Sequence, residues 1–186
     1  APDDVGFIAA MLDDLTVRFK LDEKRVFVTG FSNGASMSFR VGAELSDRIA
    51  AIAPVAGALW FDPPKFRKPV AMCYITGTED PLNLIEGGVP KLVSGAYDTV
   101  RAKPKPPVRD SIVKWAGALG CPETKVSNTN ERGLRTETHS GCLGNSEVVY
   151  HAVEGLGHTW AGGKSLLPER MVGKTSNRIN ATDVIW

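Results

Sequence analysis

The chain has 186 residues, and 42% of them are hydrophobic, which is enough for one domain with a single buried core. Its 22 basic and 21 acidic side chains leave a net charge of +1, so it offers no field that would attract nucleic acid or an anionic membrane. Every apolar run is interrupted well before the roughly 20 residues that a membrane-spanning helix needs. We therefore expect one soluble domain over residues 1–186, with no nucleic-acid or membrane partner.

Strand and helix patterns alternate along the chain. Apolar residues recur at spacings of three and four from Val5 to Phe19, which predicts an amphipathic helix ending near Lys20. Short β-branched and apolar runs predict buried strands over residues 25–30, 50–55, 69–76 and 147–153, and further helices are expected over about 33–45 and 110–119. This alternation predicts an α/β fold with a mostly parallel sheet flanked by helices.

Two of the three cysteines, Cys121 and Cys142, flank a polar stretch over residues 128–133 that we interpret as a long excursion from the core. One interpretation is a disulfide that closes this excursion, worth roughly 3 kcal/mol and indicating an oxidising compartment. The other is a pair of reduced surface thiols. Cys73 lies in an apolar run with no His or Cys at metal-ligand spacing, so we expect it to be buried. No metal or organic cofactor is expected.

Residues 30–34, Gly-Phe-Ser-Asn-Gly, match the pattern G-x-S-x-G. They stand between a predicted strand and a predicted helix, which is the setting that a nucleophile elbow requires. Glycines on both sides of the serine would let the strand and the helix approach closely. Ser32 is therefore the candidate nucleophile; the alternative is a glycine-rich turn without a catalytic role.

A serine hydroxyl needs a base within hydrogen-bond reach, and histidine is the usual one. His158 follows the predicted strand over residues 147–153, in a glycine-rich loop that can fold back over Ser32. His139, in the polar excursion, and His151, inside the strand, are weaker candidates.

The third member of such a site is a carboxylate that orients the histidine. Asp80 directly follows the predicted strand over residues 69–76 and is the first choice, with Glu79 second and Asp98 third. The order Ser32, Asp80, His158 is the chain order of the α/β-hydrolases.

Residues 30–34, 77–81 and 157–163 together resemble the secreted esterase family of polyhydroxybutyrate depolymerases, feruloyl esterases and acetyl xylan esterases. Residues 53–57 and 180–186 also resemble that family, so the resemblance covers nearly the whole chain. It implies an α/β-hydrolase fold, a secreted or periplasmic location, and a disulfide between Cys121 and Cys142. The implied substrate is a hydroxyalkanoate, feruloyl or acetyl ester, either small or polymeric.

An oxyanion hole uses the backbone N–H after the nucleophile, here that of Asn33, and a second N–H from an earlier loop. The family carries that loop and several strands before the helix with which this chain opens, so the second donor is unassigned. We expect both termini to be truncated relative to the family, or an unusual pairing to replace the missing strands. The predicted strand over residues 25–30 would then have an open edge.

These patterns predict a serine carboxylic-ester hydrolase that works through an acyl-enzyme, with Trp160 either lining the substrate pocket or packing in the core. One alternative is an impaired hydrolase fragment that acts as a binding module or forms homo-oligomers through the open sheet edge. Another is peptidase or thioesterase activity on the same three residues.

Overall fold

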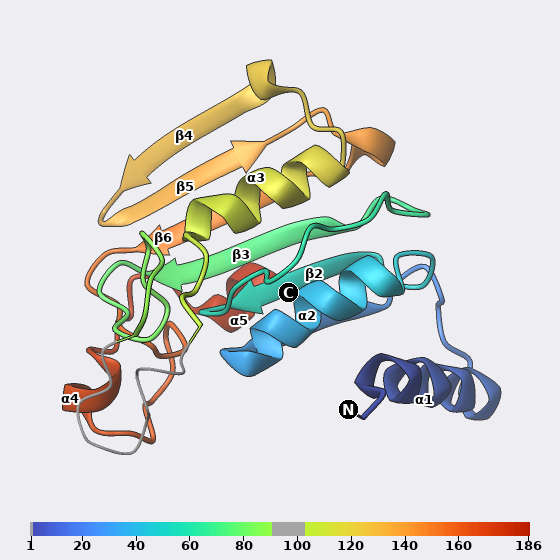
Figure 1. Cartoon of the computed structure of the whole chain (residues 1–186), viewed down its shortest axis with the longest axis horizontal. Helices are drawn as coiled ribbons and strands as arrows, with labels where there is room; N and C mark the ends of the chain where they lie inside the picture. Colours follow the sequence, from blue (N-terminus) through green and yellow to red (C-terminus); the bar gives the residue numbers. More distant parts are fainter. Residues whose placement is uncertain (1, 91–102) are drawn as a thin grey trace.

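The computed structural model describes residues 2–90 and 103–186, and its centre is a six-stranded sheet in the order β1-β2-β3-β6-β5-β4 (Figure 1). Four strands run parallel: β1 (Phe27–Phe31), β2 (Ala51–Val55), β3 (Ala71–Gly77) and β6 (Val148–Val153). The other two, β4 (Val126–Glu131) and β5 (Leu134–His139), run antiparallel to their neighbours. The mostly parallel sheet expected from the sequence is confirmed.

Helices cover both faces of the sheet (Figure 1). Helices α2 (Asn33–Glu44) and α3 (Val108–Ala118) pack on one face, and α5 (Ala181–Ile185) packs on the other. The side chains of β3 alternate accordingly, because Tyr74 lies in the core below α2 and α3 whereas Ile75 lies in the smaller core below α5. The remaining helical segments are α1 (Asp4–Arg18), α4 (Glu169–Val172), η1 (Glu123–Lys125) and η2 (Leu143–Asn145).

Helix α1 begins and ends close to its predicted bounds. The Asp3 side chain caps it by accepting the Gly6 N–H at 2.9 Å, and the helix ends at Arg18, two residues before the expected end. Within residues 2–90 and 103–186, no helix has both the length and the apolar character that crossing a bilayer would require.

The polar excursion is a β-hairpin, which the sequence analysis did not predict. Residues 126–131 lack alternating apolar side chains, so the usual strand signal is absent. The turn is formed by Arg132 and Gly133, which both have positive φ angles of 52° and 77°. A disulfide joins Cys121 to Cys142 and closes the segment that contains the hairpin, so the first of the two interpretations of these cysteines is the one observed.

Strand β1 lies at one edge of the sheet and pairs only with β2 among the described strands. Phe27 on this strand is 52% exposed. Cys73, on β3, is half-buried, and burial raises the pKa of its thiol to about 11. Its predicted burial is therefore only partly correct.

Candidate active site

The turn between β1 and α2 holds Ser32 in a strained conformation with φ of 57° and ψ of −115°. The Ser32 N–H donates to the Val55 carbonyl oxygen at 2.9 Å, which ties the turn to the end of β2. A Cβ added at Gly30 would lie 2.2 Å from the Gly34 carbonyl oxygen, so the close approach expected here depends on Gly30. A Cβ at Gly34 would meet no atom within 4 Å, so the predicted steric need for glycine is wrong at that position.

The loop that carries His158 is held against the end of β3 by glycines. A Cβ at Gly77 would lie 2.0 Å from the Leu156 carbonyl oxygen, and one at Gly157 would lie 2.2 Å from the Val172 carbonyl oxygen. Both positions therefore exclude larger residues. Because no side chain intervenes there, the segment after β6 lies next to the segment after β3. The candidate base and the candidate carboxylate lie on these two segments.

His158 lies between Ser32 and Asp80. Its Nε2 is 2.8 Å from the Ser32 Oγ, and its Nδ1 is 2.8 Å from the Asp80 Oδ2. His158 is 7% exposed and Asp80 is 3% exposed. When Nδ1 donates to the Asp80 carboxylate, Nε2 is placed to accept from the serine hydroxyl.

The second carboxylate oxygen of Asp80 is also occupied. Its Oδ1 accepts the backbone N–H groups of Leu82 and Asn83, both at 2.7 Å. These bonds fix the rotation of the carboxylate, so its Oδ2 stays aimed at the imidazole.

The other candidates lie elsewhere. Glu79 is exposed, and Asp98 lies outside the described residues. The His139 Nε2 is 2.6 Å from the Glu137 Oε1, and the His151 Nδ1 is 2.8 Å from the Thr136 Oγ1. The two weaker histidine candidates therefore pair with residues of β5 rather than with Ser32.

Asn33 and Trp160 both lie near these three side chains. Asn33 is the first residue of α2, so its backbone N–H has no acceptor within the helix. Trp160 donates its indole N–H to the Thr182 Oγ1 at 3.1 Å, and its ring centroid is 6.5 Å from that of Phe31. Phe31 in turn lies 4.9 Å from the His158 ring, centroid to centroid. Trp160 thus has a packing partner and also borders the site.

A buried tyrosine that the sequence analysis did not single out connects two sides of the site. Tyr74 is fully buried, and its hydroxyl donates to the Gly57 carbonyl oxygen at 2.5 Å. Burial raises the pKa of this hydroxyl above its usual range. The Asn83 side-chain amide approaches the same hydroxyl at 3.5 Å. The only sequence signal was a polar atom inside an otherwise apolar strand.

Similarity to known proteins agrees with this arrangement. A protein from Nocardia uniformis subsp. tsuyamanensis, named "Putative esterase NocK", is 31% identical over 193 residues, covering 97% of this chain and 55% of that protein. Feruloyl esterase B from Piromyces equi is 30% identical over 167 residues, covering 87% of this chain and 30% of that protein. An acetyl xylan esterase structure from Aspergillus awamori matches with a TM-score of 0.55 at 16% identity, over 83% of this chain and 62% of that one.

The chain has the α/β-hydrolase fold. The resemblance to esterases that residues 30–34, 77–81 and 157–163 predicted is confirmed by these relatives. The chain spans about half the length of the first relative and less than a third of the second. No family model matches the chain. In the part of the chain that the structure describes, no group of three or more His, Cys, Asp or Glu side chains is arranged to hold a metal ion.

Proposed function

We propose that this chain is the catalytic region of a serine carboxylic-ester hydrolase, with Ser32 as nucleophile, His158 as general base and Asp80 as the group that orients His158. The observation that carries the proposal is the pair of 2.8 Å contacts made by the two ring nitrogens of His158. The similarity to proteins named esterases supports the same class of reaction.

In the proposed reaction, the His158 Nε2 takes the hydroxyl proton of Ser32 while the Oγ attacks the ester carbonyl carbon. The backbone N–H of Asn33 donates to the oxyanion that forms, and Asp80 stabilises the imidazolium. His158 then gives its proton to the departing alcohol, which leaves an acyl group on Ser32. Water, activated by the same nitrogen, attacks the acyl carbon and releases the carboxylic acid.

The proposed substrates are the feruloyl, acetyl and hydroxyalkanoate esters expected from the sequence. Names of relatives favour the first two, since they include feruloyl esterases and an acetylxylan esterase. The aromatic rings of Phe31 and Trp160 beside His158 favour a substrate with a planar acyl group. Trp160 would then line the acyl pocket.

Hydrolysis of methyl ferulate and of p-nitrophenyl acetate by the wild-type chain and by Ser32→Ala tests this proposal. We expect hydrolysis by the wild type and a loss of about 10⁶-fold in kcat for the variant. Ser36→Ala, on the helix that follows the Ser32 turn, is a matched control, because the Ser36 hydroxyl accepts the Ala58 N–H rather than pairing with His158. Equal rates for wild type and Ser32→Ala would contradict the proposed nucleophile.

We also propose that the protein works in an oxidising compartment, outside the cytoplasm. The Cys121–Cys142 disulfide supports this, since such bonds persist mainly in secreted and periplasmic proteins. Intact mass after alkylation of protein purified from its native source tests the idea. A chain with one alkylated cysteine is the expected product, and three alkylated cysteines would count against it.

A second candidate role is self-association through the edge of β1. The exposed Phe27 on a strand with one described neighbour is the feature behind this alternative, because unpaired strand edges recruit other strands, but the similarity to proteins named esterases does not favour it. Sedimentation velocity across a hundredfold range of concentration tests it. A concentration-dependent mass together with no ester hydrolysis would favour this role over catalysis.

A further inference from the structure

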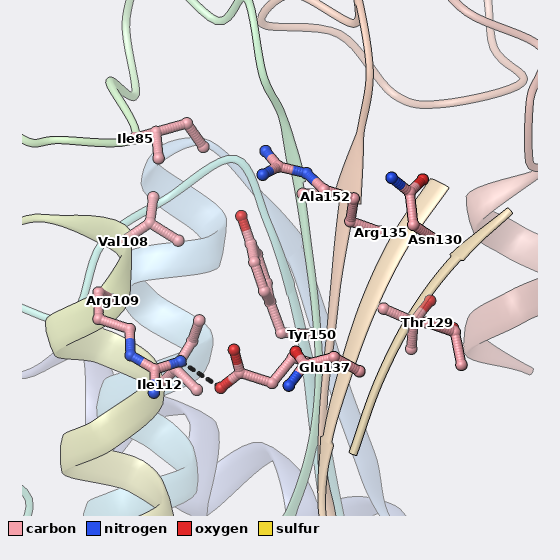
Figure 2. Close-up of a pocket in the computed structure, with 12 residues that line it drawn as sticks. Ile85, Val108, Arg109, Ile112, Thr129, Asn130, Arg135, Glu137, Tyr150 and Ala152 are labelled. Atoms are coloured by element: carbon pink, nitrogen blue, oxygen red, sulfur yellow. Dashed lines mark hydrogen bonds and ion pairs between the residues drawn. The ribbon is translucent and has the colours of Figure 1, made fainter. Parts of the chain in front are cut away.

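A cavity of about 350 Å³ lies between α3 and the hairpin of β4 and β5, with β6 at its floor (Figure 2). This volume falls in the range of about 300–1,000 Å³ that is usual for small-molecule sites. Ser32, Asp80 and His158 do not line it. The cavity is therefore separate from the candidate active site.

The cavity wall on the α3 side is aliphatic apart from Arg109. Val108 and Ile112 of α3 form most of it, and Ile85 lies at its upper end (Figure 2). The ring of Tyr150 rises from β6 between this wall and the hairpin. These groups together form a slot with apolar sides.

The opposite wall is polar. Arg135 and Glu137 lie two residues apart on β5 and therefore share one face. Their cross-strand partners on β4 are Asn130 and Asn128. Asn128, Asn130 and Arg135 are exposed and Glu137 is partly buried, so these four polar side chains form the solvent-facing side of the cavity.

The two charged groups of this wall differ in their partners. The Glu137 carboxylate pairs with the Arg109 guanidinium and with the His139 ring. Burial would raise the pKa of Glu137, but hydrogen bonds from Arg109 and His139 outweigh burial and lower it. Glu137 is thus ionised, and the Arg109 guanidinium already balances its negative charge.

Arg135, in contrast, forms no ion pair with any residue in the described ranges. Its side chain extends across the cavity toward the Tyr150 hydroxyl (Figure 2). That hydroxyl is itself paired with the Thr76 Oγ1 at 2.8 Å. Within the described residues, the Arg135 guanidinium is therefore a cationic group of the cavity without an ion-pair partner, and it lies near the Tyr150 hydroxyl.

We propose that this cavity binds an organic monocarboxylate with an apolar, ring-sized body. The carboxylate pairs with the Arg135 guanidinium, whose fork matches both oxygens. The body lies in the slot between Ile112 and the Tyr150 ring, where aliphatic and aromatic surfaces favour it over a hydroxylated sugar acid. Because Ser32 takes no part, the site does not depend on the proposed esterase reaction.

Calorimetric titration with trans-cinnamate, its neutral analogue cinnamamide, and glucuronate tests the proposal on the wild-type chain. We expect cinnamate to bind at least about tenfold more tightly than cinnamamide, because only the acid pairs with a guanidinium. Cinnamate should also shift the backbone amide NMR signals of Ile112 and Tyr150. Glucuronate should bind more weakly than cinnamate, since it lacks the apolar body.

Arg135→Gln should lower the affinity for cinnamate about tenfold or more, because it removes the charge at an exposed position without disturbing the core. Arg40→Gln is the matched control, since Arg40 is paired with Glu44 on the surface of α2. Unchanged binding by Arg135→Gln would overturn the proposal. So would NMR shifts confined to the surroundings of His158, or tighter binding of glucuronate than of cinnamate.

Discussion

The Tyr74 hydroxyl donates to the Gly57 carbonyl oxygen and thereby connects the two loops that hold the candidate site. Gly57 packs so closely on the nucleophile turn that an added Cβ would lie 2.5 Å from the Ser32 carbonyl oxygen. The same hydroxyl is approached by Asn83, whose backbone N–H holds Asp80. The Tyr74 hydroxyl oxygen therefore contacts Gly57, which packs on the Ser32 turn, and Asn83, which holds Asp80.

Replacing Tyr74 with Phe tests whether this connection positions the nucleophile. The Tyr74→Phe variant keeps the ring but leaves two buried polar groups without their partner, so we expect kcat to fall about tenfold with KM unchanged. The measurements are methyl ferulate hydrolysis and the rate at which a fluorophosphonate labels Ser32. Tyr150→Phe is the control, because the Tyr150 hydroxyl contacts Thr76 and neither loop. Equal losses in both variants would argue against a positioning role.

Asp80→Asn separates the orienting role of the carboxylate from its structural role. The Asn oxygen can still accept the N–H groups of Leu82 and Asn83, so the fold should survive. The amide donor would then face the His158 Nδ1 and favour the wrong tautomer, which should lower kcat by about 10⁴-fold. Far-UV circular dichroism and p-nitrophenyl acetate hydrolysis check both points. Glu79→Gln, at an exposed neighbour, should change neither the fold nor kcat. Full activity in Asp80→Asn would refute the orienting role of Asp80.

His151 should make the stability of the fold sensitive to mild acid. Burial lowers its pKa below the usual value of about 6.5, so the unfolded chain takes up the proton at a higher pH than the folded chain. Stability that is present above about pH 6.5 is then lost as the pH falls through the folded pKa.

Urea unfolding between about pH 7 and pH 5 measures this loss. His151→Gln should flatten the decline in the free energy of unfolding. Tyr150→Phe, at a neighbour that does not titrate in this range, should keep the wild-type decline. If the free energy of unfolding of His151→Gln declined with falling pH as steeply as that of the wild type, His151 would not be responsible for the decline.

Much of the fold was predictable because its central strands are apolar and its helices have a clear period. The strands with Ile52 and Ile75 are buried on both faces, which leaves continuous apolar runs in the sequence. The hairpin was not predictable from such patterns. It lies at the sheet edge, and its residues 126–131 are almost entirely polar and exposed, so pairing rather than burial defines it.

The candidate triad could be predicted because each member follows a strand in a recognisable local setting. Ser32 has its glycine-containing turn, and both Asp80 and His158 directly follow segments read as strands. Tyr74 could not be found this way. Its role depends on the carbonyl of Gly57 and the amide of Asn83, which only the packing of three segments brings together.

The two glycines of the elbow motif should differ sharply in their tolerance of substitution. Gly30→Ala places a Cβ 2.2 Å from a backbone oxygen of α2, which neither the strand nor the helix can relieve cheaply. We expect a loss of about 2–4 kcal/mol in the free energy of unfolding and a loss of esterase activity. Gly34→Ala meets open space on a helix, where Ala is favoured over Gly by up to about 1 kcal/mol, so stability should hold or rise. Thermal unfolding of both variants measures the difference, and equal destabilisation would mean that Gly34 is needed for a reason other than space.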